Sequence, residues 1–157
     1  MTKYRVIEIV CVILTVIFIF SSVSKEELTS FTADEISEAV ITEMNNDALI
    51  KRENEFIRDT FGIEPDLFSS VSYYSSDDVM DVSELLIGVL TAEEEAVYDS
   101  LRGYAQDRYN LFNGYAQKEA ALLDSYILET VSGVVIFCVS ENEDAVFDAF
   151  TNKLKGE

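Results

Sequence analysis

The sequence predicts an α+β fold in which a four-stranded antiparallel sheet, in the order β-β-α-β-β-α, carries helices on one face. One or two helices precede this unit, and an N-terminal transmembrane helix precedes those. Short apolar runs typical of strands come in two pairs, and a long segment with the helical period of 3.6 residues separates them, which favours an antiparallel sheet. Because 48% of the 157 residues are apolar, one domain with a substantial hydrophobic core is expected.

The N-terminal segment has the pattern of a membrane anchor. Residues 1–5 form a basic cytoplasmic tip, because basic residues stay on the cytoplasmic side. Residues 6–23 are long enough to cross a bilayer, and they carry no charge from residue 9 onward. We therefore expect a single-pass protein of the cell membrane, held there through residues 6–23, with its C-terminal domain outside.

The same segment permits two alternatives. Small residues stand where a signal peptidase reads, so secretion after cleavage near Ser24 is the first alternative. Lipid attachment at Cys11 is the second, and Val10 disfavours it because a small residue is normally needed at that position. Beyond this segment we expect a polar stalk over 24–32 and an extracytoplasmic α+β domain over 33–157.

Two helices are expected at the start of the domain. Thr32 and Glu35 have the spacing of a capping box, and the apolar stripe that follows them predicts a helix over 33–45. A second helix is predicted over 48–60 and ends before Gly62.

The rest of the domain supplies the sheet. The run of residues 85–90 has no polar face, which predicts an inner strand covered on both sides or a strand with one tightly packed face. Capping-box spacing recurs at Thr91 with Glu94 and at Ser140 with Glu143. The predicted elements are strands over 67–74 and 82–90, helices over 92–112 and 116–123, hairpin strands over 126–131 and 133–140, and a closing helix over about 141–154.

Net charge narrows the range of partners. Beyond residue 24 the chain has nine basic and 29 acidic residues, a net charge of −20. Such a domain repels phosphate backbones, which excludes nucleic acid. The expected partners are the membrane, through residues 6–23, and another extracytoplasmic protein or a wall polymer. The charge also has a simpler explanation, because it keeps a domain soluble and dispersed.

The residue inventory limits the chemistry. The chain has no histidine, so Ser-His-Asp, Cys-His and His-zinc sites are excluded. Acidic clusters at the predicted helix starts are explained by capping and by the helix dipole. We expect no catalytic residue, no cofactor and no metal, and therefore a binding or scaffolding module rather than an enzyme. The alternative is a hydrolase that cleaves a cell-wall polymer through two paired carboxylates.

The turn between the first two predicted strands supplies the candidate contact surface. Asp77, Asp78 and Asp81 lie in this turn, which begins directly after Tyr73 and Tyr74. Adjacent strand residues face opposite ways, so one of the two rings is expected to be exposed or near the edge. The predicted partner contacts are Tyr73, Tyr74, Asp77 and Asp78. A calcium loop is the alternative, disfavoured because the acidic run lacks alternating ligands and a central glycine.

Several local patterns stand out between residues 56 and 154. They are Phe61-Gly62-Ile63-Glu64, the strand over 83–90 with its acidic helix start, Phe112 and Tyr115, and the run over 133–140 before residues 145–150. In these patterns the segment over about 56–154 resembles an uncharacterised bacterial family, domain of unknown function 4358, found mostly in small exported or lipid-anchored proteins. The resemblance implies no activity and no functional residue. Lipidation is common among similar proteins, and its proper signal is missing from this sequence, which favours a plain membrane anchor.

Overall fold

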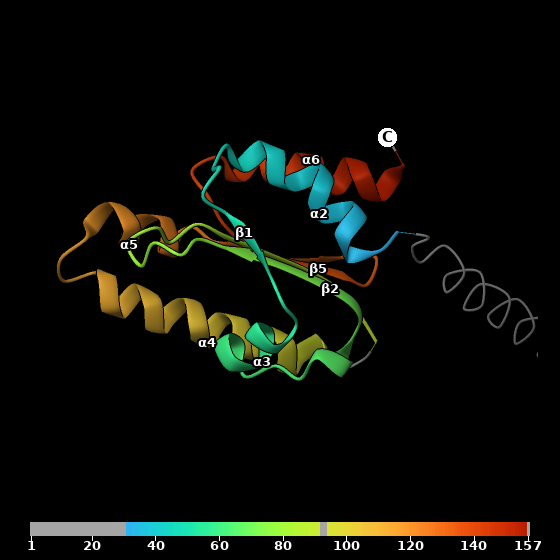
Figure 1. Ribbon diagram of the computed structural model, residues 1–157, viewed down its shortest axis with the longest axis horizontal. Helices are drawn as coiled ribbons and strands as arrows, with labels where there is room; N and C mark the ends of the chain where they lie inside the picture. The colour runs from blue at the N-terminus through green and yellow to red at the C-terminus, as the bar shows by residue number, and fades with distance from the viewer. Residues whose placement is uncertain (1–30, 92–93, 157) are drawn as a thin grey trace, which may run out of the picture. The chain divides into compact units, whose positions relative to one another are not determined.

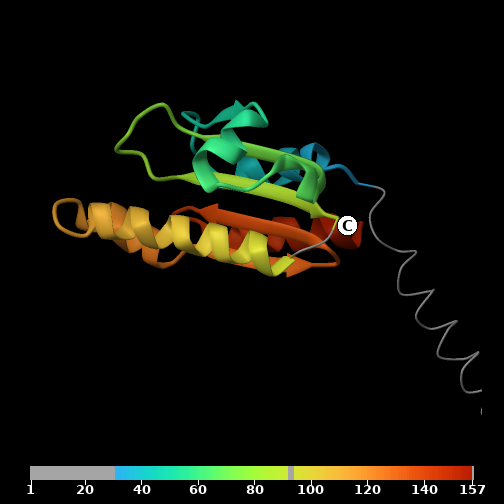
Figure 2. The same cartoon turned by 90° about the horizontal axis from the view of Figure 1, so that it is seen from below.

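One antiparallel sheet organises the residues that the computed structural model describes, which are 31–91 and 94–156. Helices cover both faces of this sheet, so that the domain has three layers (Figure 1). Helices α2 and α6 lie on one face, and helices α3, α4 and α5 lie on the other. Figure 2, turned by 90°, shows α3 and α4 side by side along the second face.

The sheet has five strands in the order β1-β2-β3-β5-β4, and every neighbouring pair is antiparallel. Consecutive strands are paired throughout, except that β3 lies beside β5 and leaves β4 at the edge. Ser132 and Gly133 both have positive φ in the β4–β5 turn, as a two-residue hairpin turn requires. The strands are β1 (Ile50–Arg52), β2 (Phe68–Ser75), β3 (Glu84–Leu90), β4 (Ile127–Val131) and β5 (Val134–Val139).

The helices fill the layers above and below the sheet. Two short 3₁₀ helices, Thr42–Met44 and Pro65–Leu67, continue the chain after α2 and lead into β2. The α-helices are α2 (Ala33–Ile41), α3 (Glu55–Phe61), α4 (Glu94–Phe112), α5 (Gln117–Asp124) and α6 (Glu143–Lys155).

The central strands β3 and β5 are buried on both faces. Leu85 and Ile136 pack with α2 and α6, whereas Leu86 and Phe137 pack with α3, α4 and α5. This explains why neither strand shows the alternation of apolar and polar residues, since a strand covered on both sides reads as a continuous apolar run. The prediction of an inner strand over 85–90 is thereby confirmed.

The expected four-stranded sheet with helices on one face is wrong in two respects. The sheet has a fifth strand, β1, which lies within the helix predicted over 48–60. The helix there begins only at Glu55 and extends to Phe61. The second difference is that α2 and α6 cover the face opposite α4, because the inner strands present large apolar side chains on both sides and both must be shielded from water.

Helix ends follow the predicted signals in part. Thr32 and Glu35 form the complete capping box at α2, with the Thr32 N–H donating to Glu35 Oε2 at 2.7 Å. Gly62 ends α3 with φ of 67°, as expected. The box predicted at Ser140 is wrong: α6 begins at Glu143, and the Ser140 hydroxyl accepts the N–H of Asn142 instead. The box predicted at Thr91 spans residues 92–93, which lie outside the described residues.

The predicted membrane segment, residues 6–23, lies outside the described residues, as do the tip over 1–5 and most of the stalk. Within residues 31–91 and 94–156, no helix is long and apolar enough to cross a membrane.

Candidate functional site

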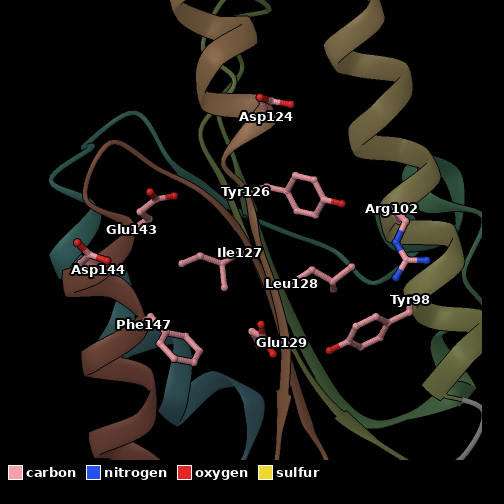
Figure 3. Close-up of a pocket in the computed structure, with 10 residues that line it drawn as sticks. All are labelled: Tyr98, Arg102, Asp124, Tyr126, Ile127, Leu128, Glu129, Glu143, Asp144 and Phe147. Atoms are coloured by element: carbon pink, nitrogen blue, oxygen red, sulfur yellow. The ribbon is translucent and has the colours of Figure 1, made fainter.

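A groove of about 540 Å³ runs along the free edge of β4 (Figure 3). Strand β4 forms its floor, α6 borders it on one side and α4 on the other. The groove therefore places the outer edge of the sheet between two helical walls.

Among residues 31–91 and 94–156, the backbone of β4 pairs with a strand on one side only. Leu90 N donates to Gly133 O at 2.9 Å, so the backbone carbonyl of Gly133 points toward β3. Every second residue of β5 after Gly133 therefore also directs its backbone N–H and C=O toward β3. The β5 residues between them bond to β4, where their partners are Ile127, Glu129 and Val131. Leu128, which lines the groove, and Thr130, two residues further along β4, therefore direct their backbone N–H and C=O away from β5, toward the free edge of the sheet.

The wall on the α6 side is acidic. Glu129 projects from β4 toward this side, because it alternates with Leu128 and Thr130 along the strand. Glu143 and Asp144 stand in the first turn of α6, and Phe147 lies one turn further along. In Figure 3 these three α6 side chains line one border of the groove, beside Ile127.

The wall on the α4 side is aromatic. Tyr98 and Arg102 extend from α4, and Tyr126 and Leu128 face them from the strand side (Figure 3). Tyr98, Tyr126 and Leu128 are half-buried and pack against the core of that face. Asp124, at the end of α5, closes the upper end of the groove.

The groove carries an excess of negative charge. Its four carboxylates, Asp124, Glu129, Glu143 and Asp144, form no salt bridge with any described residue. Arg102 is the cation among the lining residues, and its guanidinium lies 3.4 Å from Asp99 on the same helix. A ligand in this groove would therefore meet unpaired carboxylates beside aromatic rings.

The opposite edge of the sheet is closed by charge pairs. Strand β1 has three residues, and Lys51 Nζ lies 2.7 Å from Asp34 Oδ1 of α2. Arg52 donates to the side chain and the carbonyl of Ser75 and lies 2.7 Å from Asp77. A short edge strand with paired cations is a common protection against further strand pairing. Strand β4 is longer and has no such cation.

A second polar cluster lies in the core beneath α4. Glu84, the first residue of β3, has 0% of its surface exposed. Its Oε2 accepts hydrogen bonds from Tyr73 at 2.9 Å and from Tyr104 at 3.0 Å. Its Oε1 lies 2.6 Å from Nη1 of Arg108, whose side chain is 21% exposed. The cluster thus joins strands β2 and β3 to helix α4.

Aromatic rings screen this cluster from water. Phe61 packs edge-on against Tyr73 and Tyr104, with ring centroids 5.0 and 4.6 Å away. Burial raises the pKa of the Glu84 carboxyl, and the charge of Arg108 with the two hydroxyl donors offsets part of this effect. Burial and the adjacent carboxylate raise the pKa of Tyr73 and Tyr104. Both tyrosines therefore stay protonated and act as donors.

The predicted contact residues separate in the structure. Tyr73 is 3% exposed and donates to Glu84, whereas Tyr74 is half-buried against the core of the opposite face. Asp77 pairs with Arg52, and Asp78 accepts the N–H of Met80 within the turn. Tyr73 is thus part of the core cluster, and the other three remain at the surface or half-buried near β1.

The acidic turn is held by its own hydrogen bonds. Asp81 accepts from Asn46 Nδ2 at 2.8 Å and from Ser83 N at 3.0 Å. Burial raises the pKa of Asp81, but these hydrogen bonds outweigh it and hold the pKa below its usual value. Among residues 31–91 and 94–156, no group of three or more carboxylate or thiol side chains is placed to hold a metal ion.

The sequence did not predict that Glu84, Tyr104 and Arg108 form a cluster, and it did not predict the groove beside β4. A signal was present for Glu84, because a carboxylate directly before five apolar side chains of an inner strand needs a buried partner. No local sequence pattern indicated the groove, because its two walls come from α4 and α6. These helices lie far apart in sequence, and the sheet topology places them on either side of β4.

No curated protein and no solved structure matches this chain. Residues 42–140 do match a family described as a domain of unknown function, DUF4358. The match begins in the 3₁₀ helix after α2, covers all five strands and ends directly after β5, so it includes both the β4 edge and the buried Glu84 cluster. It extends over more than half of the sequence and confirms the predicted resemblance: the chain belongs to the DUF4358 family.

Proposed function

We propose that this protein is a binding module that takes up a protein partner in the groove along β4. The observation that supports this most is the outer backbone edge of Leu128 and Thr130, which pairs with no strand among the described residues and, at Leu128, lies between an acidic wall and an aromatic wall. Exposed sheet edges recruit further strands, and natural proteins usually close them. Here the β1 edge is closed by Lys51 and Arg52, while nothing in the described part of the chain pairs with the outer edge of the longer β4.

The module works at the membrane surface, outside the cytoplasm, in this proposal. The support is the sequence of residues 1–23, where a basic tip precedes an uncharged apolar run. The net charge of −20 beyond residue 24 adds to it, because the domain is repelled by anionic lipid headgroups and extends away from them.

The alternative of a wall-polymer hydrolase receives less support from the geometry. Such an enzyme needs a carboxylic acid facing a carboxylate across a cleft. Glu84, whose pKa burial raises, is fully buried, and its oxygens are occupied by two tyrosines and an arginine. It therefore holds the core together and does not face a substrate.

Site-specific photo-cross-linking in intact cells tests the proposed function. Tyr98 in the groove is replaced by p-benzoylphenylalanine, and Tyr115, 60% exposed and outside the groove, receives the same replacement as the matched control. We expect a discrete adduct with another protein from position 98 and none from position 115. Equal cross-linking at both positions, or none at position 98, would contradict a binding site in the groove.

A further inference from the structure

The open edge of β4 and the different character of its two walls define what the groove can hold. We infer that its ligand is an extended peptide segment in which basic and apolar side chains alternate, added to the sheet as a sixth strand beside β4. This inference rests on the proposed function and specifies the partner chemistry of the same groove.

The backbone of the ligand is specified by Leu128 and Thr130. Each offers one N–H donor and one C=O acceptor along the free edge, at the two-residue spacing of a strand. Only a segment in extended conformation repeats its own donors and acceptors at this spacing. Addition of such a strand to an exposed edge is a common mode of peptide recognition.

The alternation of side chains follows from the two walls. Successive residues of an added strand point to opposite faces of the sheet. Those that point to the α6 side meet Glu129, Glu143 and Asp144, which have no cationic partner among the described residues. Lysine or arginine side chains fit there. Those that point to the α4 side meet Tyr98, Tyr126 and Leu128, and apolar side chains fit there.

A second copy of this chain is a poorer occupant. Pairing two β4 edges would bring the Glu129, Glu143 and Asp144 walls of both copies close together, with no lysine or arginine on the strand to offset them. Each domain also carries a net charge of −20 beyond residue 24, so the copies repel one another at low salt. A basic segment would instead be attracted to the carboxylates of the acidic wall.

Peptide binding to the full chain in non-ionic detergent tests the inference. The probe is a fluorescein-labelled eight-residue peptide of alternating valine and lysine. Two control peptides have the same charge: one has four valines followed by four lysines, and the other is methylated on alternate backbone nitrogens. Since a domain with excess negative charge attracts any cationic peptide, the difference between these equally charged peptides is the informative quantity. We expect the alternating peptide to bind at least about tenfold more tightly than either control.

Hydrogen exchange locates the bound strand. In the free protein, the amides of Leu128 and Thr130 should exchange rapidly, whereas those of Ile127, Glu129 and Val131 are protected by β5. The alternating peptide should protect Leu128 and Thr130 alone. Protection elsewhere, or none at these two residues, would overturn strand addition at β4.

Two variants separate the backbone from the charge. Thr130→Pro removes the outward N–H at a place where an edge strand tolerates proline, and it should weaken binding by about tenfold. Thr130→Val is its matched control, because it keeps the N–H and the branched shape and removes only a hydroxyl that has no partner among the described residues. Glu129→Lys with Asp144→Lys should reverse the preference toward an alternating valine and glutamate peptide, while Asp107→Lys, on α4 outside the groove, should not.

The outcomes distinguish the inference from the proposed function. Equal binding of the alternating, block and methylated peptides overturns the inference, and so does binding that Thr130→Pro leaves unchanged. If position 98 still cross-links to another protein, the proposed function then stands with a different kind of ligand. A cross-link from position 98 to a second copy, together with dimers in solution, would overturn the inference and show that the occupant of the groove is another copy of this protein. Absence of both peptide binding and cross-linking removes both proposals.

Discussion

The two faces of the sheet are covered by helices in different ways. Beneath α2 and α6 the core is built from aliphatic and aromatic side chains, with Phe150 and Ile136 fully buried. Beneath α3, α4 and α5 an equally apolar core encloses the Glu84 cluster. Polar contacts of α2 with the sheet lie at its exposed or part-buried end, where Asp34 pairs with Lys51 and Ala33 N donates to Ser70, whereas hydrogen bonds from Tyr104 and Arg108 to the buried Glu84 fix both the rotation and the height of α4 on the sheet.

This difference bears on the groove. Tyr98 and Arg102 lie on the same helix as Tyr104 and Arg108, about two turns nearer its N-terminus. The buried cluster therefore sets the position of the aromatic wall, while the acidic wall on α6 depends on apolar packing. Buried ion pairs add little net stability compared with apolar side chains, so positioning of α4 is the better explanation for this one.

Loss of the Glu84 carboxylate should have the largest effect of any single change in the cluster. Glu84→Ala leaves Arg108 and two tyrosine hydroxyls without their acceptor in the core, and it opens a cavity. We expect the free energy of unfolding to fall by about 3–5 kcal/mol, measured by urea unfolding of the full chain in detergent.

The control for that experiment is a variant in which both faces of the sheet have an apolar core. A variant with Glu84→Met, Arg108→Met, Tyr73→Phe and Tyr104→Phe removes every polar member together and fills the space with apolar side chains. It should recover most of the stability that Glu84→Ala loses, because replacing a whole buried ion pair by apolar groups is often neutral. If it is as unstable as Glu84→Ala, the polar cluster is itself a main source of stability.

The comparison also shows which parts of the fold the sequence could predict. The strands at 67–74 and 82–90 and the hairpin after residue 126 were predicted correctly because each has a local apolar pattern. Strand β1 has none: its three residues include Lys51 and Arg52, and they are extended only because they pair with β2. The covering of the face opposite α4 was missed for a related reason, since helices α2 and α6, which cover it, lie far apart in sequence.

The candidate site was less predictable than the fold. Glu84, Tyr104 and Arg108 belong to segments that only the sheet register and the packing of α4 bring together. Tyr73 was predicted to contact a partner because it stands beside an acidic turn, yet its hydroxyl reaches inward to Glu84. Sequence patterns gave the side of the strand on which each tyrosine lies, but not what covers that side.

The α4 face of the sheet should not accommodate a side chain larger than hydrogen at Gly88 of β3. A Cβ at this position would lie 2.5 Å from two ring atoms of Phe68, which is itself buried. We expect Gly88→Ala to lower the free energy of unfolding by about 1–3 kcal/mol. Gly103→Ala on α4 is the matched control, because no atom lies within 4 Å of its added Cβ and alanine favours a helix. It should raise stability by about 0.5–1 kcal/mol. Equal effects of the two substitutions would contradict close packing at Gly88.

The pH dependence of stability tests the state of Glu84 in this face. Burial raises the pKa of its carboxyl in the folded protein, so its contribution to stability is fully present below the unfolded pKa of about 4.5. That contribution is lost as the pH rises through the folded pKa. Glu84→Gln cannot titrate, so the stability of the parent relative to this variant should decrease as the pH is raised from 4 to 7. A relative stability that increases over this range would mean that Arg108 and the two tyrosines outweigh burial.

The smallest expected change in stability is on the face covered by α2 and α6. It concerns a buried hydroxyl in this otherwise apolar core. Ser37 on α2 is fully buried, and its hydroxyl has no hydrogen-bond partner among the described residues. Ser37→Ala removes this unsatisfied group and places a better helix former in α2, so the free energy of unfolding should rise by about 0.5–1 kcal/mol. Ser100→Ala, on the partly exposed side of α4, gains the helix propensity alone and serves as the matched control.

Thermal unfolding of the two variants and of the parent protein compares their stabilities. A larger gain at position 37 than at position 100 means that the hydroxyl is a cost to the apolar face, and an equal or smaller gain means that a bound water satisfies it there.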